Sequence, residues 1–555
     1  MSDTPPPVPA ARSAWRNVAF LLLCVVAAGA LLGSLWKSEP PPAPKRFHPS
    51  LTADAKFQAA VQRLNAAFES EWQKAGIEPV PPAPVLSLAR RLSLGLAGTV
   101  PSLEEIRALE KQPPDQAVQW WLTYLFEDRR YSDFVAERLA RAFVGVEAGP
   151  SLVFRRHRLT DWLSGQLAAN RPYDQVARDL ITAEGIWTSQ PAVNFVTATV
   201  DQNNDKKGPD EVKLAGRLAR AFLGVRLDCV ECHDDFMGGS WEQKDFHQLA
   251  AYFAQAEMSL TGVRDNVKVN YQFRYHGKNT EEPVPPAVPF KGELMPSDGP
   301  LRERLAKWAT HPHNRAFART AVNRVWALLF NRPLTEKIDS IPLEGPWPAG
   351  MEVLTDELIA SGFDVQRLIR VIAASQVFQR DSRAAEGREP VTDAQEKLYA
   401  AFPLTRLRPE QVAGAVSQAA ALRTIDAEAH LVLRATRFFQ GADFVKRYGD
   451  LGEDEFDPRG GTIPQRLILM NGDLVTERTK ENMVMNASTR IAALAPDDET
   501  AVETAYLCAL TRRPTDAERA HFVDQLEGKQ GKARNEAMED LFWTLINATE
   551  FSWNH

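Results

Sequence analysis

Apolar side chains recur at helical spacing along most of the chain after residue 50. In the stretch Leu51 to Ala75 they stand about one turn apart at Phe57, Val61, Leu64, Phe68 and Trp72, and Gly76 follows as a stop. The same spacing runs through residues 120–126, 134–144, 159–169, 173–183, 211–227, 245–256, 314–330 and 365–378. The pattern predicts a mainly α fold.

Several helix starts carry their own signals. Ser102 with Glu105 and Thr515 with Glu518 have the form of capping boxes. Asn314 and Asp364 are suitable N-caps, and Pro409 suits the first turn of a helix. These residues predict where five helices begin.

The best strand pattern lies at Val267 to Tyr275, where apolar and polar residues alternate. A lone strand is unstable, so we expect a small sheet there, and the Pro-rich residues 282–286 that follow mark a boundary. The chain then divides into a helical domain at 51–265, a connecting segment with a strand at 266–300, and a second helical domain at 301–555.

The first 50 residues are predicted to lie outside these domains. Residues 1–17 form a polar cytoplasmic tail, 18–36 an apolar run long enough for a transmembrane signal anchor, and 37–50 a stiff Pro-rich linker. A signal-peptidase site at Ala28 to Ala30 is the alternative, but the apolar run continues beyond it. Residues 21–24 could also suggest a lipoprotein with a lipid on Cys24, but the bulky Leu23 directly before the cysteine argues against it.

The composition narrows the function. The net charge of −7 shows no basic surplus, so no nucleic-acid partner is expected. The chain has no Gly-rich phosphate loop, no G-x-S-x-G elbow and no H-E-x-x-H motif. The lack of these motifs argues against the commonest enzyme classes, but it does not exclude other kinds of catalysis.

The chemistry centres on Cys229, Cys232 and His233. Cys-x-x-Cys-His is the attachment motif of c-type haem, and the chain has only four Cys and ten His. Cys229 and Cys232 are therefore expected to bind haem c covalently, with His233 as the iron ligand. A Cys-x-x-Cys disulfide or dithiol, or a site that has lost its haem, stays open. A zinc site lacks a second Cys pair, since Cys24 lies in the apolar run and Cys508 stands alone.

Stretches along most of the chain resemble a known family. They are residues 90–101, 171–175, 223–234 and 245–253, and then 304–308, 314–319, 323–326, 363–365 and 547–551. They are similar to the planctomycete and verrucomicrobial large paralogous family, with a cytochrome-c-like domain of unknown function followed by a planctomycete-specific domain. The resemblance implies a secreted or membrane-attached protein with a haem motif, and no assigned biochemical role.

One departure from the family concerns the residues after the motif. Members commonly read Cys-His-Asp-His-Pro-Phe, whereas this chain has Asp235 at the second His and no Pro. If that second His is a ligand elsewhere in the family, this chain lacks it. The candidates for a sixth iron ligand are Met295, Met258 and His247.

The sequence thus predicts a membrane-anchored, mono-haem c-type protein that transfers electrons to or from a redox protein partner. Since c-type haem is attached outside the cytoplasm, the bulk of the chain is expected on the periplasmic side. Two alternatives stay open: a haem-dependent oxidoreductase with an open sixth site, and a non-catalytic surface or scaffold module with a structural Cys pair.

Overall fold

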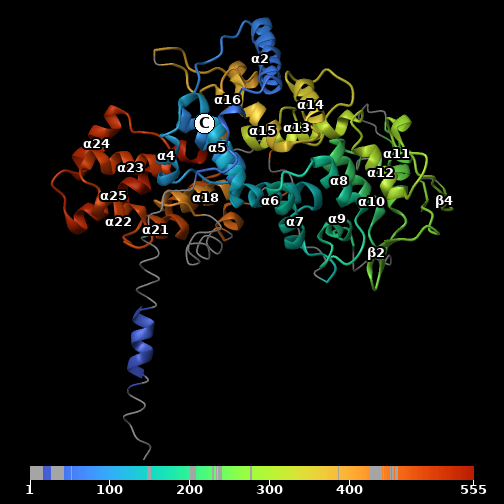
Figure 1. Cartoon of the computed structure of the whole chain (residues 1–555), viewed down its shortest axis with the longest axis horizontal. Coiled ribbons are helices and arrows are strands. Elements are labelled where there is room, and N and C mark those ends of the chain that lie inside the picture. The colour runs from blue at the N-terminus through green and yellow to red at the C-terminus, as the bar shows by residue number, and fades with distance from the viewer. Residues whose placement is uncertain are drawn as a thin grey trace, which may run out of the picture.

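The protein is mainly helical, as the sequence predicts. The computed structural model describes residues 15, 17–26, 43–51, 53–146, 152–200, 208–227, 230–232, 234, 241–275, 278–385, 387–425, 441, 443–449, 452, 456 and 461–555. Helices dominate this part of the chain, and its three sheets have two strands each (Figure 1).

The first lobe comprises residues 53–402, and its helices surround one apolar core. Its helices are α2 (Ala55–Ala75), α3 (Val85–Ala97), α4 (Leu103–Leu109), α5 (Pro114–Glu127), α6 (Arg129–Val144), α7 (Arg156–Ala168), α8 (Tyr173–Thr182), α9 (Asn194–Thr197), α10 (Glu211–Leu218), α11 (Gln243–Ala250), α12 (Leu301–Ala309), α13 (Arg315–Phe330), α14 (Met351–Ala360), α15 (Val365–Ala374), α16 (Gln376–Gln379) and α17 (Asp393–Lys397). Its shorter helical turns are η2 (Pro191–Val193), η3 (Ala219–Leu223), η5 (Ala251–Phe253) and η6 (Gly292–Leu294), and η1 (Pro49–Leu51) precedes the lobe. The core contains residues from both sides of 266–300, so that segment does not divide it.

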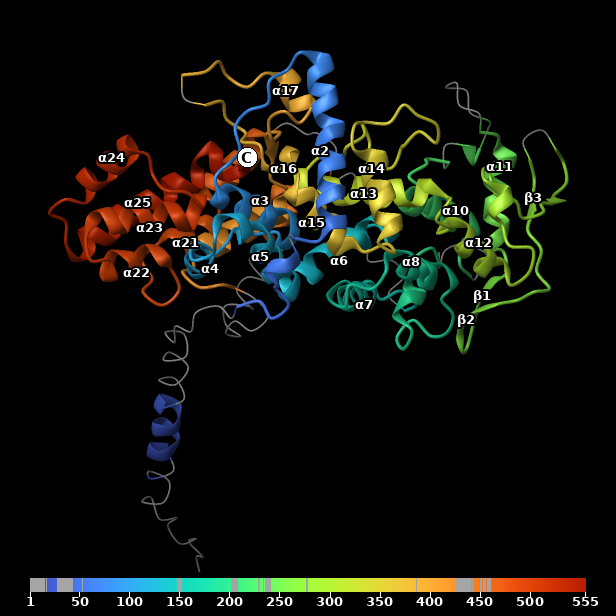
Figure 2. The same cartoon turned by 45° about the horizontal axis from the view of Figure 1, so that its top comes forward.

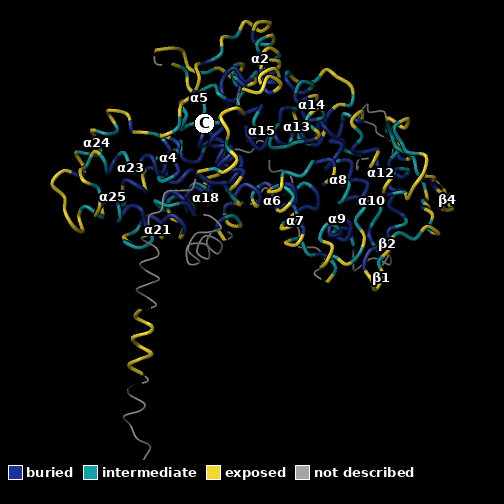
Figure 3. Tube along the Cα trace, in the orientation of Figure 1, coloured by how far each residue is buried: buried dark blue, intermediate teal, exposed yellow. Residues whose placement is uncertain are grey.

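The second lobe comprises residues 405–555, and its later helices form the red end of the molecule in Figures 1 and 2. Its elements are β5 (Thr405–Arg406), α18 (Pro409–Ala419), α20 (Ile463–Asn471), α21 (Asp473–Thr479), α22 (Ala487–Leu494), α23 (Asp498–Leu510), α24 (Asp516–Leu526), α25 (Gly531–Asn547), η7 (Thr549–Ser552) and β6 (Trp553–Asn554). Strand β6 pairs antiparallel with β5, so the last strand closes onto the first. Leu94 and Val100 of the first lobe complete its core, and buried residues run through both lobes (Figure 3).

Helix α3 lies where the two lobes meet, and glycines allow its close contacts. A Cβ on Gly95 would stand 2.6 Å from the Leu328 carbonyl oxygen of α13. A Cβ on Gly414 of α18 would stand 2.2 Å from the carbonyl oxygen of Gly98, which ends α3. The backbones therefore approach more closely than any side chain would permit.

All five predicted helix starts are confirmed, but one of them lacks the expected side-chain cap. Ser102 and Thr515 accept from the amides of Glu105 and Glu518, which complete capping boxes. Asp364 accepts from the Arg367 amide at 2.9 Å, and Pro409 begins α18. The Asn314 residue does precede α13, but its side chain makes no cap. Its Nδ2 donates instead to the Trp308 carbonyl at 3.1 Å.

The predicted helices at 211–227 and 245–256 end early. The first becomes α10 and the π-helical turn η3, which stops at Gly224 with φ of 62°. The second becomes α11 and η5, and Ala256 already belongs to strand β1 (Ala256–Ser259), which pairs with β2 (Gly262–Asp265).

The predicted strand at Val267 to Tyr275 is reduced to β3 (Gln272–Phe273), which pairs with β4 (Glu282–Pro283). Its alternation has another use: Tyr271, Phe273 and Tyr275 share one side and contact the ring of His247. The three aromatic residues therefore stand two positions apart because they pack against His247, rather than because they belong to a larger sheet.

The N-terminal prediction is tested only in part. Residues 17–26 form an exposed helix, while 27–36 lie outside the described residues. Over the ranges that the structure describes, no helix is long and apolar enough to cross a membrane.

The close contact at Gly414 predicts a measurable cost of adding a methyl group. Gly414→Ala would push α18 away from the Gly98 carbonyl, and we expect a loss of about 1–3 kcal/mol in the free energy of unfolding. The matched control is Gly165→Ala in α7, where no atom lies within 4 Å of the added Cβ. That variant should gain roughly 0.5–1 kcal/mol, because alanine favours a helix interior. Urea unfolding of both variants measures the difference, and equal effects would contradict the packing of α3 on α18.

Candidate functional site

The Cys-x-x-Cys-His motif follows η3 at the end of a buried segment. Leu227 and Val230 are buried, and the Val230 amide donates to the Leu227 carbonyl at 3.1 Å. Cys232 is exposed and forms no disulfide. Cys229 and His233 lie outside the described residues, so the structure places one of the three predicted haem residues.

Helix α11 holds the motif in place through Glu231 and Asp234. The Gln243 side chain donates to the Glu231 carbonyl at 2.9 Å, and the Gln243 amide donates to Asp234 Oδ1 at 2.8 Å. His247 Nε2 lies 3.1 Å from the same Glu231 carbonyl. Two side chains, one turn apart on α11, thus converge on one backbone oxygen between the cysteines.

His247 is fully buried, and both ring nitrogens have partners. Nδ1 lies 2.9 Å from the Tyr271 hydroxyl, and the ring stacks on Phe273 with centroids 3.4 Å apart. A carbonyl can only accept, so Nε2 donates to Glu231 and Nδ1 accepts from Tyr271. Burial lowers the pKa of His247 and raises that of Tyr271, which keeps the imidazole neutral and the hydroxyl protonated.

The other sixth-ligand candidates lie on different elements. Met258 is half-buried in β1, opposite Val263, and Met295 is half-buried directly after η6. Of the three candidates, His247 is the one with a described hydrogen bond to the motif, and both its nitrogens are already engaged. It therefore positions the motif in this structure and offers no nitrogen to a metal.

The two other cysteines lie outside the motif. Cys24 is exposed in the helix at 17–26, whereas Cys508 is buried in α23. Burial raises the pKa of Cys508 to about 12, so its thiol stays protonated and unreactive. Over the described ranges, no group of three His, Cys, Asp or Glu side chains could hold a metal ion.

A cavity of about 240 Å³ adjoins Glu231 of the motif. Its apolar wall includes Phe143, Val212, Phe246 and Ile338, and its charged groups are Lys213, Arg217, Arg220, Arg324, Glu231 and Asp339. Arg220 and Arg226 bind opposite oxygens of Asp339 at 3.0 and 2.8 Å. Burial alone would raise the pKa of Asp339, but these two guanidinium groups lower it below its usual value. The cavity combines an apolar wall with a cationic rim.

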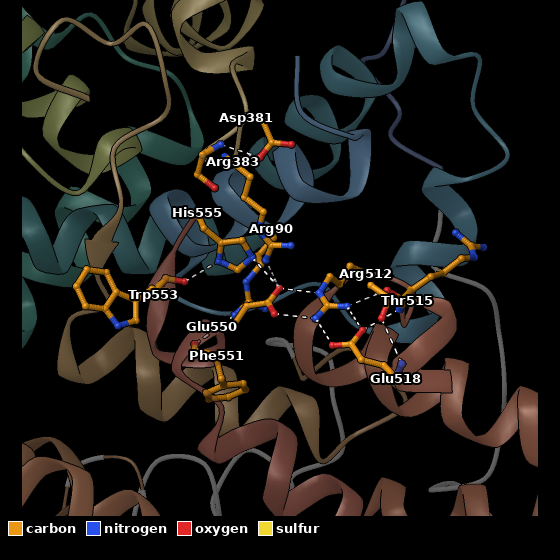
Figure 4. Close-up of polar contacts among 12 residues, drawn as sticks. Arg90, Asp381, Arg383, Arg512, Thr515, Glu518, Glu550, Phe551, Trp553 and His555 are labelled. Atoms are coloured by element: carbon orange, nitrogen blue, oxygen red, sulfur yellow. Dashed lines mark hydrogen bonds and ion pairs between the residues drawn. The ribbon is translucent and has the colours of Figure 1, made fainter. Parts of the chain in front are cut away.

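A second concentration of charged groups lies between the lobes (Figure 4). Glu550 accepts from Arg512 at 2.7 and 2.8 Å and from Arg383 at 2.9 Å, and His555 Nε2 lies 3.3 Å away. Arg512 also binds both oxygens of Glu518, at 2.8 and 2.9 Å, and this contact lowers the pKa of Glu518 to about 2. Burial raises the pKa of Glu550, but Arg512 and His555 reverse this and hold it well below its usual range.

Next to Glu550, two buried arginines of α3 bind main-chain oxygens in all the hydrogen bonds described for them. Arg90 donates to Ala509 and Phe551, and Arg91 donates to His555, Phe378 and Arg380. The sequence did not single out this cluster as a site. Its signal was an arginine pair inside an apolar helical stretch, which is unusual because guanidinium groups are rarely buried without partners.

Two family models match the chain. Residues 63–258 match PSCyt2, described as a protein of unknown function (DUF1549), and residues 301–433 match PSD1, described as a protein of unknown function (DUF1553). Their order is consistent with the planctomycete-type paralogous family that the sequence resembles. No curated protein and no solved structure is significantly similar to the chain. The matches assign neither a cofactor nor an activity.

The hydrogen bond from His247 of α11 to the motif predicts the effect of replacing this histidine. His247→Phe keeps the stacking on Phe273 but removes both hydrogen bonds, which leaves the Tyr271 hydroxyl buried without its partner. We expect a loss of about 1–3 kcal/mol in the free energy of unfolding. Hydrogen exchange at residues 230–232 should become faster. The control is His521→Phe on exposed α24, and unchanged exchange in His247→Phe would contradict the positioning role.

The low pKa of Glu550 predicts how stability depends on pH. An ionised Glu550 stabilises the fold above its unfolded pKa near 4.5, and this contribution is lost as the pH falls toward the folded value. Glu550→Gln should therefore be less stable than wild type at pH 7, by about 1–3 kcal/mol. The difference should shrink as the pH is lowered below about 4.5. Urea midpoints measured between pH 7 and acid test this, with exposed Glu536→Gln, whose partner is Lys532, as a control that changes little.

Proposed function

We propose that the protein is a membrane-anchored, extracytoplasmic c-type haem protein that transfers electrons. One observation carries the proposal: the Cys-x-x-Cys-His segment is held from the inside by α11, while Cys232 remains exposed. A buried cysteine such as Cys508 could not react with a haem vinyl group without unfolding. An exposed cysteine on a supported loop can.

The surroundings of the motif suit a haem in chemistry and only partly in size. The apolar wall at Phe143 and Phe246 would favour the ring, and the cationic rim would favour the propionates. At about 240 Å³ the cavity is below the roughly 300–1,000 Å³ of pockets that enclose a ligand. It is too small to enclose the whole group.

The roles of the chain's own residues follow from this arrangement. Cys229 and Cys232 would form the two thioethers, and His233 would supply the proximal imidazole. Bound haem would supply one-electron chemistry, with a potential set by its axial ligands and hydrogen bonds. His247 and Gln243 would hold the Glu231 carbonyl, and so the spacing between the two thiols, constant.

The location belongs to the same proposal. Residues 18–36 would anchor the chain in the membrane, and the Pro-rich residues 37–50 would separate the lobes from the surface. The lobes would then lie on the periplasmic side, where c-type haem is attached and a redox partner protein could dock.

One observation favours a second candidate function. Both nitrogens of His247 are engaged, and Met258 and Met295 lie on other elements without a described bond to the motif. An iron without a sixth side-chain ligand could accept a substrate, which is the requirement for a haem-dependent oxidoreductase. The absorption spectrum separates a six-coordinate carrier from an enzyme with an open site.

Covalent haem is tested by expression with a c-type maturation system. Wild type should give a haem stain on a denaturing gel and a sharp α-band on reduction, and Cys229→Ala/Cys232→Ala should lose both. Cys24→Ala is the control, because Cys24 is exposed but lies outside the motif. A folded, matured wild type without haem would overturn the electron-transfer proposal and favour a structural module.

A further inference from the structure

The chain just before the Cys-x-x-Cys-His motif is held by residues of the second matched region. Asp339 accepts from Arg220 Nε at 3.0 Å and from Arg226 Nε at 2.8 Å, with a different carboxylate oxygen for each. Two residues further on, the Ile341 amide donates to the Gly224 carbonyl at 2.7 Å. One short segment thus fixes three positions, the last of which stands three residues before the first motif cysteine.

The segment that is held in this way has an unusual backbone. Turn η3 is π-helical, a conformation that is rare in proteins and occurs mostly at functional sites. Gly224 then turns the chain with φ of 62°, and a Cβ there would stand 2.6 Å from Thr320 Oγ1. Arg220 lies before this turn and Arg226 after it, so Asp339 bridges the two ends. The bridge fixes the direction in which the chain continues toward the motif.

A buried asparagine of α13 holds the loop that carries Asp339. Asn323 Oδ1 accepts from the amides of Leu334 and Thr335 at 2.8 and 3.2 Å, and Nδ2 donates to the Ile338 carbonyl at 3.2 Å. Asp339 follows directly and is 5% exposed. Burial raises its pKa, but the two guanidinium groups outweigh this and lower it, so the carboxylate is ionised at neutral pH.

Asp339 also lines the cavity beside the motif. The lining includes Arg220, Arg324 and Glu231, which is one of the two residues between the cysteines. Arg324 Nη2 donates to the Arg220 carbonyl at 3.2 Å, which is a further contact from the second matched region. One carboxylate therefore contacts the approach to the motif and the cavity next to it.

We propose that Asp339 is a positioning residue for the Cys-x-x-Cys-His motif. It holds Arg220 and Arg226 together, so that the motif keeps one orientation relative to the cavity, and it keeps one negative charge in the cavity wall. The site is thus composite, since the first matched region carries the motif and the second carries the group that orients it. The orientation does not require haem, whereas an effect of the charge on a redox potential rests on the proposed function.

The first test measures hydrogen exchange in the full chain produced without haem maturation. Asp339→Asn should accelerate exchange in residues 222–232 by about tenfold or more, because it weakens two charge-assisted contacts. Exchange in α2 and α15 should stay unchanged, and Asp339→Glu, which keeps the charge, should restore part of the protection. The matched control is Asp356→Asn on α14, because Asp356 is 64% exposed and pairs with Arg315 Nη1 at 2.7 Å.

The second test measures the midpoint potential of the matured protein. The oxidised state carries one more positive charge, so loss of a nearby negative charge destabilises it. Asp339→Asn should therefore raise the potential, and the ratio of reduced to oxidised protein at a fixed potential should increase by about threefold or more. Asp339→Glu and Asp356→Asn should stay near wild type. An ion pair that served stability alone would shift the urea midpoint and leave the potential unmoved.

The two tests separate this proposal from the proposed function. Exchange that rises equally throughout the first lobe, or not at all, overturns the positioning role, and so does an unchanged potential in haem-loaded Asp339→Asn. Local acceleration with a raised potential, both at least partly reversed in Asp339→Glu, supports it. A folded, matured wild type without haem overturns the proposed function alone, and the exchange measurement then decides the role of Asp339.

Discussion

Arg90 and Arg91 are adjacent on α3, fully buried, and hydrogen-bonded to backbone carbonyls of both lobes. Arg90 reaches Ala509 and Phe551 in the second lobe. Arg91 reaches Phe378 and Arg380 in the first lobe, and its guanidinium stacks 3.7 Å from the ring centre of Phe402. Burial lowers the pKa of Arg90 to about 10 and of Arg91 to about 9, so both stay charged at neutral pH. Oriented main-chain oxygens, together with the nearby carboxylates of Glu550 and Asp381, replace water around the two buried charges, and these contacts join the two lobes.

The regions that match two separate family models do not fold as two separate bodies. The Tyr173 amide donates to the Phe363 carbonyl at 3.1 Å, and the Ile341 amide donates to the Gly224 carbonyl at 2.7 Å. Each bond joins the first matched region to the second, and one apolar core contains residues of both. The structural division falls near residue 403, within the second matched region, because the core of the second lobe, apart from Leu94 and Val100, consists of residues from Leu407 onward.

This organisation determines which residues surround the Cys-x-x-Cys-His motif. Residues 223–227 lead from η3 to the motif and stay largely buried, and Gly224 permits this path because a Cβ there would collide with Thr320. His247 lies on α11 next to the motif. Tyr271, Phe273 and Tyr275, from the segment predicted to be a strand, pack against its ring. The motif is thus a local sequence signal whose support includes residues about 40 positions away, such as Tyr271 and Phe273.

By itself the sequence determined the local features: the mainly α fold, the capping boxes at Ser102 and Thr515, and the position of the Cys-x-x-Cys-His motif. These depend on residues within about one helical turn of each other, so short patterns report them. Only the tertiary structure decided the partners of Arg90, Arg91 and Glu550, the engagement of both His247 nitrogens, and the place of the lobe boundary. Each of these depends on pairing groups that are distant in the chain, and burial and hydrogen bonding select those pairs after the helices have packed.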